Sequence, residues 1–221
     1  MNIAINELFF SIQGEGPNCG APAVFIRFQG CQLRCPWCDT GGSLDPNDPH
    51  EDMTPEQVLT HISQWPCRHA VITGGDPSFQ PDGLDALTTL LSQNGFTLEI
   101  ETSGLRPVDK EICTRFSYIN VGLKLPNAEQ KFADNYYRNA AEHYGAMGNA
   151  NFKIVIAGPD DVEFVQTRLV ESGLIPRDRI YLMPLGDTID QQNANAPTVL
   201  ETCKQYGFHF SPRLHIMFGV R

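Results

Sequence analysis

Short apolar runs rich in β-branched residues alternate with amphipathic segments along this chain of 221 residues. This alternation is typical of an α/β domain in which helices connect mostly parallel strands. Thr54, followed by Pro55 and Gln57, predicts a helix N-terminus with a capping box. The expected strands are 23–29, 69–73, 97–102, 118–122, 151–156 and 179–183, with a weaker one near 208–211. The expected helices are 54–64, 84–93, 129–144, 160–172 and 197–206.

The number of expected strands limits the architecture. Six strands are too few for a closed eight-stranded barrel, so the pattern predicts an open, partial (β/α) barrel of about six parallel strands. The length fits one sizeable domain, residues 1–221. Residues 5–14 precede the first strand of the barrel, and we expect them to add a lid or an edge strand.

Three cysteines stand close together after the first strand of this expected barrel. Cys31, Cys35 and Cys38 have the spacing CxxxCxxC. Three thiolates at this spacing can hold three irons of a cubic iron–sulfur cluster. The next cysteine is Cys67, beyond a predicted loop and helix. One iron would therefore keep an open position, and an open metal site is a site for chemistry.

Zinc is an alternative metal that these cysteines could bind. Zinc sites usually combine two ligand pairs, but the sequence has no second CxxC pair and no HxxxH pair among its six histidines. A non-enzymatic iron–sulfur electron carrier is another alternative, although such carriers usually complete the cluster with a fourth cysteine. The favoured interpretation is a cluster with one open iron.

Small and polar residues follow several expected strands, at the edge where parallel α/β sheets bind ligands. Thr73-Gly74-Gly75-Asp76-Pro77 follows one strand, Glu101-Thr102-Ser103-Gly104 ends another, and Gly122-Leu123-Lys124 ends a third. Arg27 lies inside the apolar run 24–28. Burying a charge in a central strand is costly unless it is paired, so Arg27 either faces solvent or binds an anion in the site.

Composition excludes several classes of function. The chain has 16 Lys and Arg against 26 Asp and Glu, a formal net charge of −10, so nucleic acid is a poor guess for a partner. The first residues lack a basic region followed by a long apolar run, and no apolar stretch could span a bilayer, so we expect no signal peptide and no membrane contact. Seven cysteines without a regular framework favour the reducing cytoplasm over a disulfide scaffold.

The cysteine segment resembles the cluster motif of radical S-adenosylmethionine (SAM) enzymes. In that superfamily SAM chelates the open iron, and one electron from the cluster cleaves the sulfonium to give a 5′-deoxyadenosyl radical. The segment Gly74-Gly75-Asp76-Pro77 resembles the superfamily's GGEP motif, which holds the ammonium of SAM, with Asp76 in the place of the glutamate. Trp37 fits the aromatic position before the third cysteine.

A longer stretch resembles one family of this superfamily, 7-carboxy-7-deazaguanine synthase. The resemblance rests on Asn6-Glu7-Leu8-Phe9, on 11–16, on 22–28, on Cys38-Asp39-Thr40 and on 101–104, and it is looser beyond the first hundred or so residues. It implies ring contraction of 6-carboxy-5,6,7,8-tetrahydropterin to 7-carboxy-7-deazaguanine with loss of ammonia, on the pathway to queuosine and related 7-deazapurines. The implied cofactors are a 4Fe–4S cluster, SAM used catalytically, and Mg²⁺.

The same resemblance implies partners and residue roles. We expect a flavodoxin- or ferredoxin-type electron donor and a homodimer. Cys31, Cys35 and Cys38 would bind the cluster, and the Thr40 hydroxyl would bind Mg²⁺. The residues expected at SAM are Trp37, Asp39, Gly75, Asp76, Ser103, Gly122, Leu123 and Lys124. The residues expected at the pterin are Ile12, Gln13, Gly14, Glu15, Thr73, Thr102 and Arg27, which would hold its carboxylate.

A radical SAM activase, which would install a glycyl radical on a partner protein, stays open as an alternative. It shares the cysteine spacing and a similar length, but it should not need Arg27 or the segment 13–16. The family's common Ser-Pro-Lys is replaced here by Gly122-Leu123-Lys124, in which the lysine is kept.

Overall fold

A nine-stranded sheet forms the centre of the computed structural model, which describes residues 1–129 and 136–220. Its strand order is β3-β1-β2-β4-β5-β6-β7-β8-β9. The strands are β1 (Ile3–Ile12), β2 (Pro22–Phe28), β3 (Glu51–Met53), β4 (His69–Gly74), β5 (Thr97–Thr102), β6 (Tyr118–Leu123), β7 (Ala150–Ile156), β8 (Ile180–Pro184) and β9 (His209–Phe210). Neighbouring strands run parallel from β2 to β9, and β1 pairs antiparallel with β2 and β3.

The sheet confirms the predicted open barrel but is larger than the predicted six strands. Every expected strand is present within one or two residues, and the weak run 208–211 contains β9. The expected edge strand at 5–14 is β1. The sequence reading missed β3, because a three-residue strand with two exposed carboxylates has no apolar alternation to reveal it. Since β3 and β9 end the strand order, the sheet does not close on itself.

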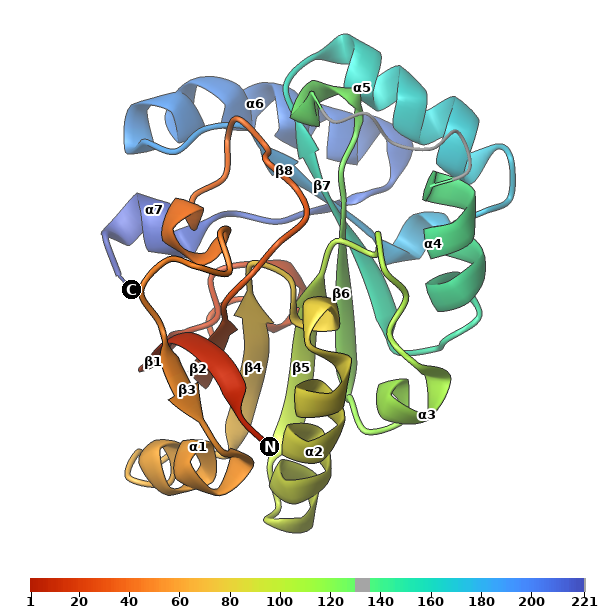
Figure 1. Ribbon diagram of the computed structural model, residues 1–221. Coiled ribbons are helices and arrows are strands. Elements are labelled where there is room, and N and C mark those ends of the chain that lie inside the picture. The colour runs from red at the N-terminus through yellow and green to blue at the C-terminus, as the bar shows by residue number, and fades with distance from the viewer. Residues whose placement is uncertain (130–135, 221) are drawn as a thin grey trace.

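Helices cover the outer side of this curved sheet (Figure 1). They are α1 (Pro55–Ile62), α2 (Pro81–Gln93), α3 (Lys110–Cys113), α4 (Tyr136–Gly145), α5 (Pro159–Phe164) and α6 (Ile189–Tyr206), whereas the short α7 (Leu214–Phe218) borders the interior through His215. In α2, Leu84, Leu87 and Leu91 recur on one face and are fully buried in the core. Within the described residues, no helix is long and apolar enough to cross a membrane.

Two helix predictions need correction. The helix expected at 197–206 begins eight residues earlier, since α6 starts at Ile189 and Thr188 caps it by accepting from the backbone N–H of Gln191. Pro197 lies inside α6, although proline is most common at a helix start. The helix expected at 160–172 is α5 followed by a wider π-helical segment, Val165–Val170. The capping box at Thr54 is confirmed, whereas part of the helix expected at 129–144 lies outside the described residues.

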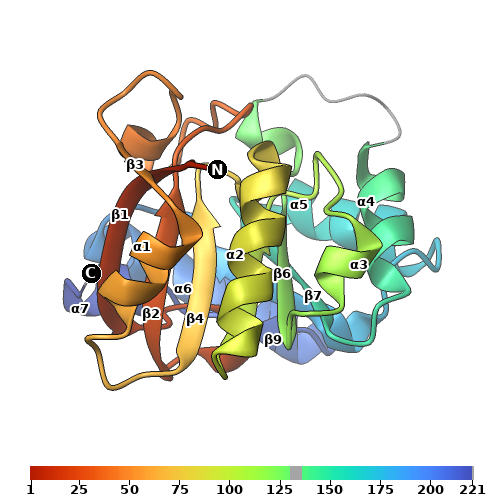
Figure 2. The same cartoon turned by 60° about the horizontal axis from the view of Figure 1, so that its bottom comes forward.

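Segments from both ends of the chain meet beside the open edge of the sheet. The backbone N–H of Gly16, just after β1, donates to Ser211 Oγ at 2.8 Å, and the N–H of Leu214 donates to Gly14 O at 3.1 Å. Figure 2 shows α7 near the end of β1. The loop after β1 and the C-terminal segment are therefore held together, and both border the interior of the barrel.

Candidate active site

A cavity of ≈ 380 Å³ lies inside the curved sheet, at the carboxyl ends of the parallel strands. It is lined by every residue that the sequence assigned to the cluster, Mg²⁺, SAM or the pterin, except Asp76 and Leu123. Leu123 is buried in the apolar core, so a contact with SAM could come only from its backbone. The tertiary structure thus brings together residues from five strands, β1, β2, β4, β5 and β6, and from the loops that follow them, which the sequence could associate only by motif.

The loop that carries the three cysteines is closed at its base. The N–H of Gly30 donates to Ser43 O at 2.8 Å, and the N–H of Cys31 donates to Leu44 O at 2.9 Å. Within the loop, the N–H of Leu33 points to Cys31 Sγ at 3.4 Å. These bonds hold residues 31–44 as a compact excursion from the end of β2, with the cysteine thiols at the cavity.

The chemistry of this donor set fits an iron–sulfur cluster. All three thiols line the cavity and none is in a disulfide. Burial raises the pKa of the Cys31 thiol to about 11 and also raises that of Cys35. Bound iron would supply the positive charge that stabilises these groups as buried thiolates.

Close backbone packing requires the paired glycines Gly74 and Gly75 at the end of β4. A Cβ added to Gly74 would lie 2.5 Å from Phe28 N, and one added to Gly75 would lie 2.6 Å from Ser43 O. Gly74 also has φ +139°, a backbone conformation that residues other than glycine rarely adopt. The glycines therefore allow the end of β4 to pack against β2 and the cysteine loop. This packing requires glycine whether or not a ligand is bound.

Asp76 is held entirely by protein groups. Its carboxylate is buried and accepts five hydrogen bonds. The donors are the N–H and Oγ of Ser78 at 3.1 and 2.8 Å, Thr102 Oγ1 at 2.9 Å, and the N–H and Oγ of Ser103 at 3.0 and 2.5 Å. Asp76 thus joins the ends of β4 and β5 and fixes Ser103 at the cavity wall. Its direct contact with SAM stays a prediction.

The side chain of Gln13 is likewise hydrogen-bonded to other protein groups. Its Nε2 donates to Glu99 Oε1 at 2.6 Å and to Glu101 Oε1 at 3.2 Å, and its Oε1 accepts from the N–H of Glu15. Its backbone N–H and carbonyl bond to Ala21 and Gly20, both at 2.8 Å. Gln13 therefore orders the loop after β1, and its predicted contact with the pterin is untested.

Arg27 faces the cavity rather than bulk solvent. Its side chain is 15% exposed, and its Nε donates to Glu7 Oε1 at 2.7 Å. The guanidinium also lies over the ring of Phe9, 5.5 Å from the ring centroid. Arg27 therefore does not face bulk solvent, and its binding of an anion in the site stays a prediction.

Lys124 also lies at the cavity wall, with its ammonium 5.3 Å from the centroid of the Trp37 ring. Tyr136 of α4 supports this region, because its hydroxyl donates to Ser103 O at 2.6 Å and accepts from the N–H of Lys124 at 3.4 Å. The ends of β5 and β6 are thereby tied together. Trp37 is fixed by its Nε1, which donates to Asn127 O at 3.2 Å.

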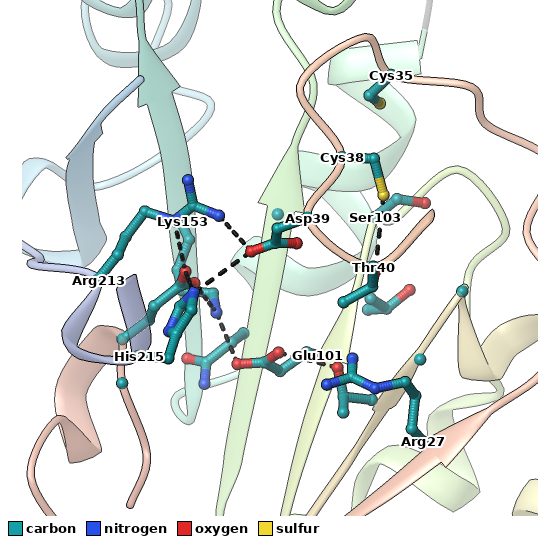
Figure 3. Close-up of a pocket in the computed structure, with 18 of the residues that line it drawn as sticks. Arg27, Cys35, Cys38, Asp39, Thr40, Glu101, Ser103, Lys153, Arg213 and His215 are labelled. Atoms are coloured by element: carbon teal, nitrogen blue, oxygen red, sulfur yellow. Dashed lines mark hydrogen bonds and ion pairs between the residues drawn. The ribbon is translucent and has the colours of Figure 1, made fainter. Parts of the chain in front are cut away.

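A buried network of ion pairs forms one wall of the cavity (Figure 3). Lys153 of β7 is 5% exposed and bridges Glu15 Oε2 at 2.8 Å and Glu101 Oε1 at 2.7 Å. Arg213 Nε lies 3.1 Å from Glu15 Oε1. Burial alone would raise the pKa of Glu15, but the charges of Lys153 and Arg213 outweigh it and lower the pKa to about 2. Glu15 is therefore a carboxylate at any physiological pH.

The same network reaches the cysteine loop through Asp39. Arg213 Nη2 pairs with Asp39 Oδ2, and His215 Nε2 lies 3.3 Å from that oxygen (Figure 3). Burial opposes the charge on Asp39, but the hydrogen bond from His215 and the charge of Arg213 hold its pKa well below its usual range. Glu15, Asp39 and His215 offer three ligand atoms within 4.8 Å of one another. Because Arg213 already neutralises this group, we interpret it as an ion-pair network rather than a metal site.

Sequence reasoning missed several residues of the site. Glu101, Lys153, Arg213, His215, Glu99 and Asn120 had no assigned role. Glu99, Glu101 and Lys153 are charges inside apolar strand runs, the signal that singled out Arg27, and the same test would have found them. Arg213 and His215 carry no local signal for these ion pairs, because the carboxylates that they contact lie 174 to 198 residues earlier in the chain.

Comparison with known proteins bears on this site. The model of the radical SAM superfamily matches residues 25–157. A 7-carboxy-7-deazaguanine synthase from Pyrobaculum aerophilum is 37% identical over 216 residues, which cover 97% of this chain and 94% of that protein. The enzyme of the same name from Hyperthermus butylicus is 31% identical, with 97% and 92% covered.

Solved structures agree with these sequence relatives. The crystal structure of QueE from Escherichia coli aligns with a TM-score of 0.75 and 29% identity, covering 96% of this chain and 94% of that chain. A structure of TYW1 with a bound lysine–pyruvate adduct aligns with a TM-score of 0.56 at 15% identity, which indicates a shared fold alone. The chain belongs to the radical SAM superfamily and, within it, to the 7-carboxy-7-deazaguanine synthase family.

Proposed function

We propose that this chain converts 6-carboxy-5,6,7,8-tetrahydropterin to 7-carboxy-7-deazaguanine, a radical SAM ring contraction with loss of ammonia. The main support for this proposal is the similarity to 7-carboxy-7-deazaguanine synthases over 97% of the chain, together with the three cysteines that line a cavity at the expected sheet edge. The comparisons support neither a glycyl-radical activase nor an electron carrier.

The 4Fe–4S cluster and SAM follow from membership of the superfamily. When bound, they supply one-electron cleavage of SAM and a carbon radical able to abstract hydrogen from the substrate. Cys31, Cys35 and Cys38 would hold the cluster. At the SAM site, Ser103 and Lys124 offer a hydroxyl and an ammonium to the polar groups of SAM, and Trp37 offers an aromatic face.

The remaining residues would orient the pterin and exclude water. Arg27 would bind the pterin carboxylate with the edge of its guanidinium that Glu7 leaves free, since Glu7 pairs with Nε. Thr73 and Thr102 line the same cavity with hydroxyl groups. The carboxylates of Glu15 and Glu101 suit donor groups of the heterocycle, although both are already paired with Lys153.

Mg²⁺ would bind at the Thr40 hydroxyl. This group lines the cavity, 3.6 Å from Cys38 Sγ. A hard cation that keeps several waters and takes one neutral oxygen from the protein fits such a place, with substrate oxygens completing the shell.

The proposal extends to partners and setting. A flavodoxin- or ferredoxin-type protein would deliver the electron, and the chain would act as a homodimer in the cytoplasm. The free state of all seven cysteines supports a reducing compartment. One continuous sheet built from strands β1 to β9 supports a single radical SAM domain over residues 1–221.

The decisive experiment is anaerobic turnover. The cluster-reconstituted protein is incubated with SAM, Mg²⁺, a reductant and 6-carboxy-5,6,7,8-tetrahydropterin, and the products are measured by mass spectrometry. We expect 7-carboxy-7-deazaguanine in excess over SAM consumed, and no product from Cys35→Ala. Cleavage of SAM with an untouched pterin would refute the substrate, while product without added Mg²⁺ would refute only the role of Thr40.

A further inference from the structure

Glu99 is a carboxylate that lies deeper in the barrel than the cavity wall. It stands in the middle of β5 and is fully buried. Glu101, two positions later, is half-buried and lines the cavity (Figure 3). Side chains two residues apart in a strand project from the same face, so both carboxylates point into the interior of the barrel. Glu99 therefore lies one layer below Glu101, toward the amino ends of the parallel strands.

Four side-chain nitrogen atoms converge on Glu99. Its Oε1 lies 2.6 Å from Gln13 Nε2 and 2.6 Å from Asn120 Nδ2. Its Oε2 lies 2.7 Å from Asn18 Nδ2 and 3.0 Å from His69 Nε2. A buried carboxylate is stable only when donors satisfy its oxygens, and these contacts supply donors to both. Each of the three amides must therefore turn its NH₂ group, rather than its oxygen, toward Glu99.

Gln13 transmits this orientation to the cavity wall. Its NH₂ group has two hydrogens, and the Nε2 that donates to Glu99 also lies 3.2 Å from Glu101 Oε1. Its Oε1 is thereby left to accept from the N–H of Glu15 at 3.2 Å. In a reversed amide, the oxygen would face two carboxylates and the NH₂ group would face another donor, so all three bonds would be lost. Glu99 thus selects the one orientation of Gln13 that serves both Glu15 and Glu101.

Glu15 and Glu101 are the two cavity carboxylates that Lys153 bridges, at 2.8 and 2.7 Å. The other oxygen of Glu101 accepts from Thr73 Oγ1 at 3.0 Å. A carboxylate oxygen can accept more than one hydrogen bond, and the Glu101 side chain is 24% exposed. The N–H groups of a ligand can therefore still reach Glu101, whose place is fixed by Lys153, Thr73 and Gln13.

We propose that Glu99 is a positioning residue for the pterin. It orients the Gln13 amide, and through Gln13 it holds Glu15 and Glu101 where the N–H groups of the heterocycle bind. This inference rests on the proposed function, because it takes the pterin as the ligand of the cavity.

The residues expected at SAM are held by other groups. Trp37 Nε1 donates to Asn127 O, and Ser103 Oγ donates to the Asp76 carboxylate. The loss of Glu99 should therefore weaken binding of the pterin and leave binding of SAM intact. This difference separates a positioning role from general damage to the fold.

The test measures two affinities in a double-mutant cycle. Cluster-loaded protein without reductant is equilibrated by dialysis with pterin-6-carboxylate in the presence of SAM and, separately, with SAM alone. The proteins are the wild type, Glu99→Leu, Gln13→Met and the double variant. The control is Thr88→Val, which removes a fully buried hydroxyl that donates to Leu84 O within α2, outside the cavity.

We expect Glu99→Leu and Gln13→Met each to weaken binding of pterin-6-carboxylate roughly tenfold, as for one lost buried hydrogen bond, with SAM affinity unchanged. The double variant should bind the pterin no more weakly than either single variant, because Glu99 acts through Gln13. Thr88→Val should bind both ligands as the wild type does. If Glu99→Leu fails to fold, Glu99→Asp replaces it with the same expectation, since the shorter side chain withdraws the carboxylate from Gln13.

Three outcomes would refute this inference alone. They are unchanged pterin affinity in the Glu99 variant, an equal loss of SAM and pterin affinity, and additive losses in the double variant, which would mean that Glu99 acts independently of Gln13. A wild type that binds SAM but not pterin-6-carboxylate would instead refute the proposed substrate, and this inference with it.

Discussion

Individual polar residues in this protein are divided between those that hold the site together and those that would be left to bind a ligand. Asp76 and Gln13 belong to motifs that resemble ligand-binding segments, yet their side chains bond to other protein groups. Among the described residues, Arg27 is hydrogen-bonded through Nε alone, and its side chain lines the cavity. The hydrogen-bond partners of a side chain, rather than its motif, therefore indicate its role.

Replacing Asp76 with asparagine tests this division. The new NH₂ group would face donors instead of acceptors, so we expect the free energy of unfolding to fall by about 2–4 kcal/mol in urea titrations. Asp48→Asn makes the same chemical change in an exposed loop and should have little effect. Unchanged stability combined with weaker SAM binding would instead identify Asp76 as a direct ligand.

The charge of Glu15 predicts a pH dependence of stability. Its pKa is about 2 in the folded protein against a usual 4.5, so the folded state binds the proton more weakly than the unfolded state. The resulting stabilisation, on the order of 3 kcal/mol, is complete above about pH 4.5 and is lost as the pH falls toward 2. Urea unfolding of the cluster-free protein at pH 6 and pH 3 should therefore show a smaller loss in Glu15→Gln than in the wild type. The exposed control Glu171→Gln should follow the wild type.

At the scale of elements, the site depends on how closely the loop after β4 packs against the cysteine loop. The N–H of Gly75 donates to Phe28 O at 3.1 Å, and the N–H of Asp76 donates to Gly30 O at 2.9 Å. These two bonds continue the parallel pairing of β2 and β4 into the loops that follow them. The position of the cysteines is therefore set partly by a segment more than 30 residues away.

Gly75→Ala tests this dependence. Its new Cβ would overlap the backbone of Gly30 and Ser43, so the cysteine loop must shift. We expect a loss of at least about 2 kcal/mol in stability and a lower iron and sulfide content after reconstitution. Gly41→Ala is the matched control in the same loop, because its Cβ would have nothing within 4 Å. Full cluster loading of Gly75→Ala would contradict the proposed packing role.

At the scale of the whole molecule, the C-terminal segment completes the site. Arg213 bonds Glu15 after β1, Asp39 in the cysteine loop, and Gly186 O after β8, where its Nη1 lies at 2.6 Å. One buried guanidinium thus joins three segments that are far apart in sequence and lie around the open side of the sheet. Removing one partner of a buried ion pair leaves the others uncompensated.

Arg213→Met should therefore loosen the segments that it joins. We expect faster amide hydrogen exchange at residues 14–16 and 38–40, which are distant from Arg213 in the chain, with smaller changes in strands β4 to β6. Lys204→Met removes an exposed lysine that pairs with Glu201 on α6 and should leave the exchange rates unchanged. Faster exchange confined to the C-terminal residues themselves would refute the joining role of Arg213.

The sequence by itself determined the features that depend on spacing along the chain. The separation of Cys31, Cys35 and Cys38 indicated the cofactor, and the alternation of apolar runs located every parallel strand of the open barrel. The strand ends also predicted where the cavity lies. These signals are local, because a metal motif, a capping box or a strand is specified by residues a few positions apart.

Only the tertiary structure decided which polar groups remain for a ligand. Glu99, Gln13 and Asn120 lie on three different elements, and their bonds exist only once β1, β5 and β6 curve around one interior. The same holds for Arg213 and Glu15, 198 residues apart. Hydrogen-bond partners across such distances depend on strand order and curvature, which no local pattern of residues specifies.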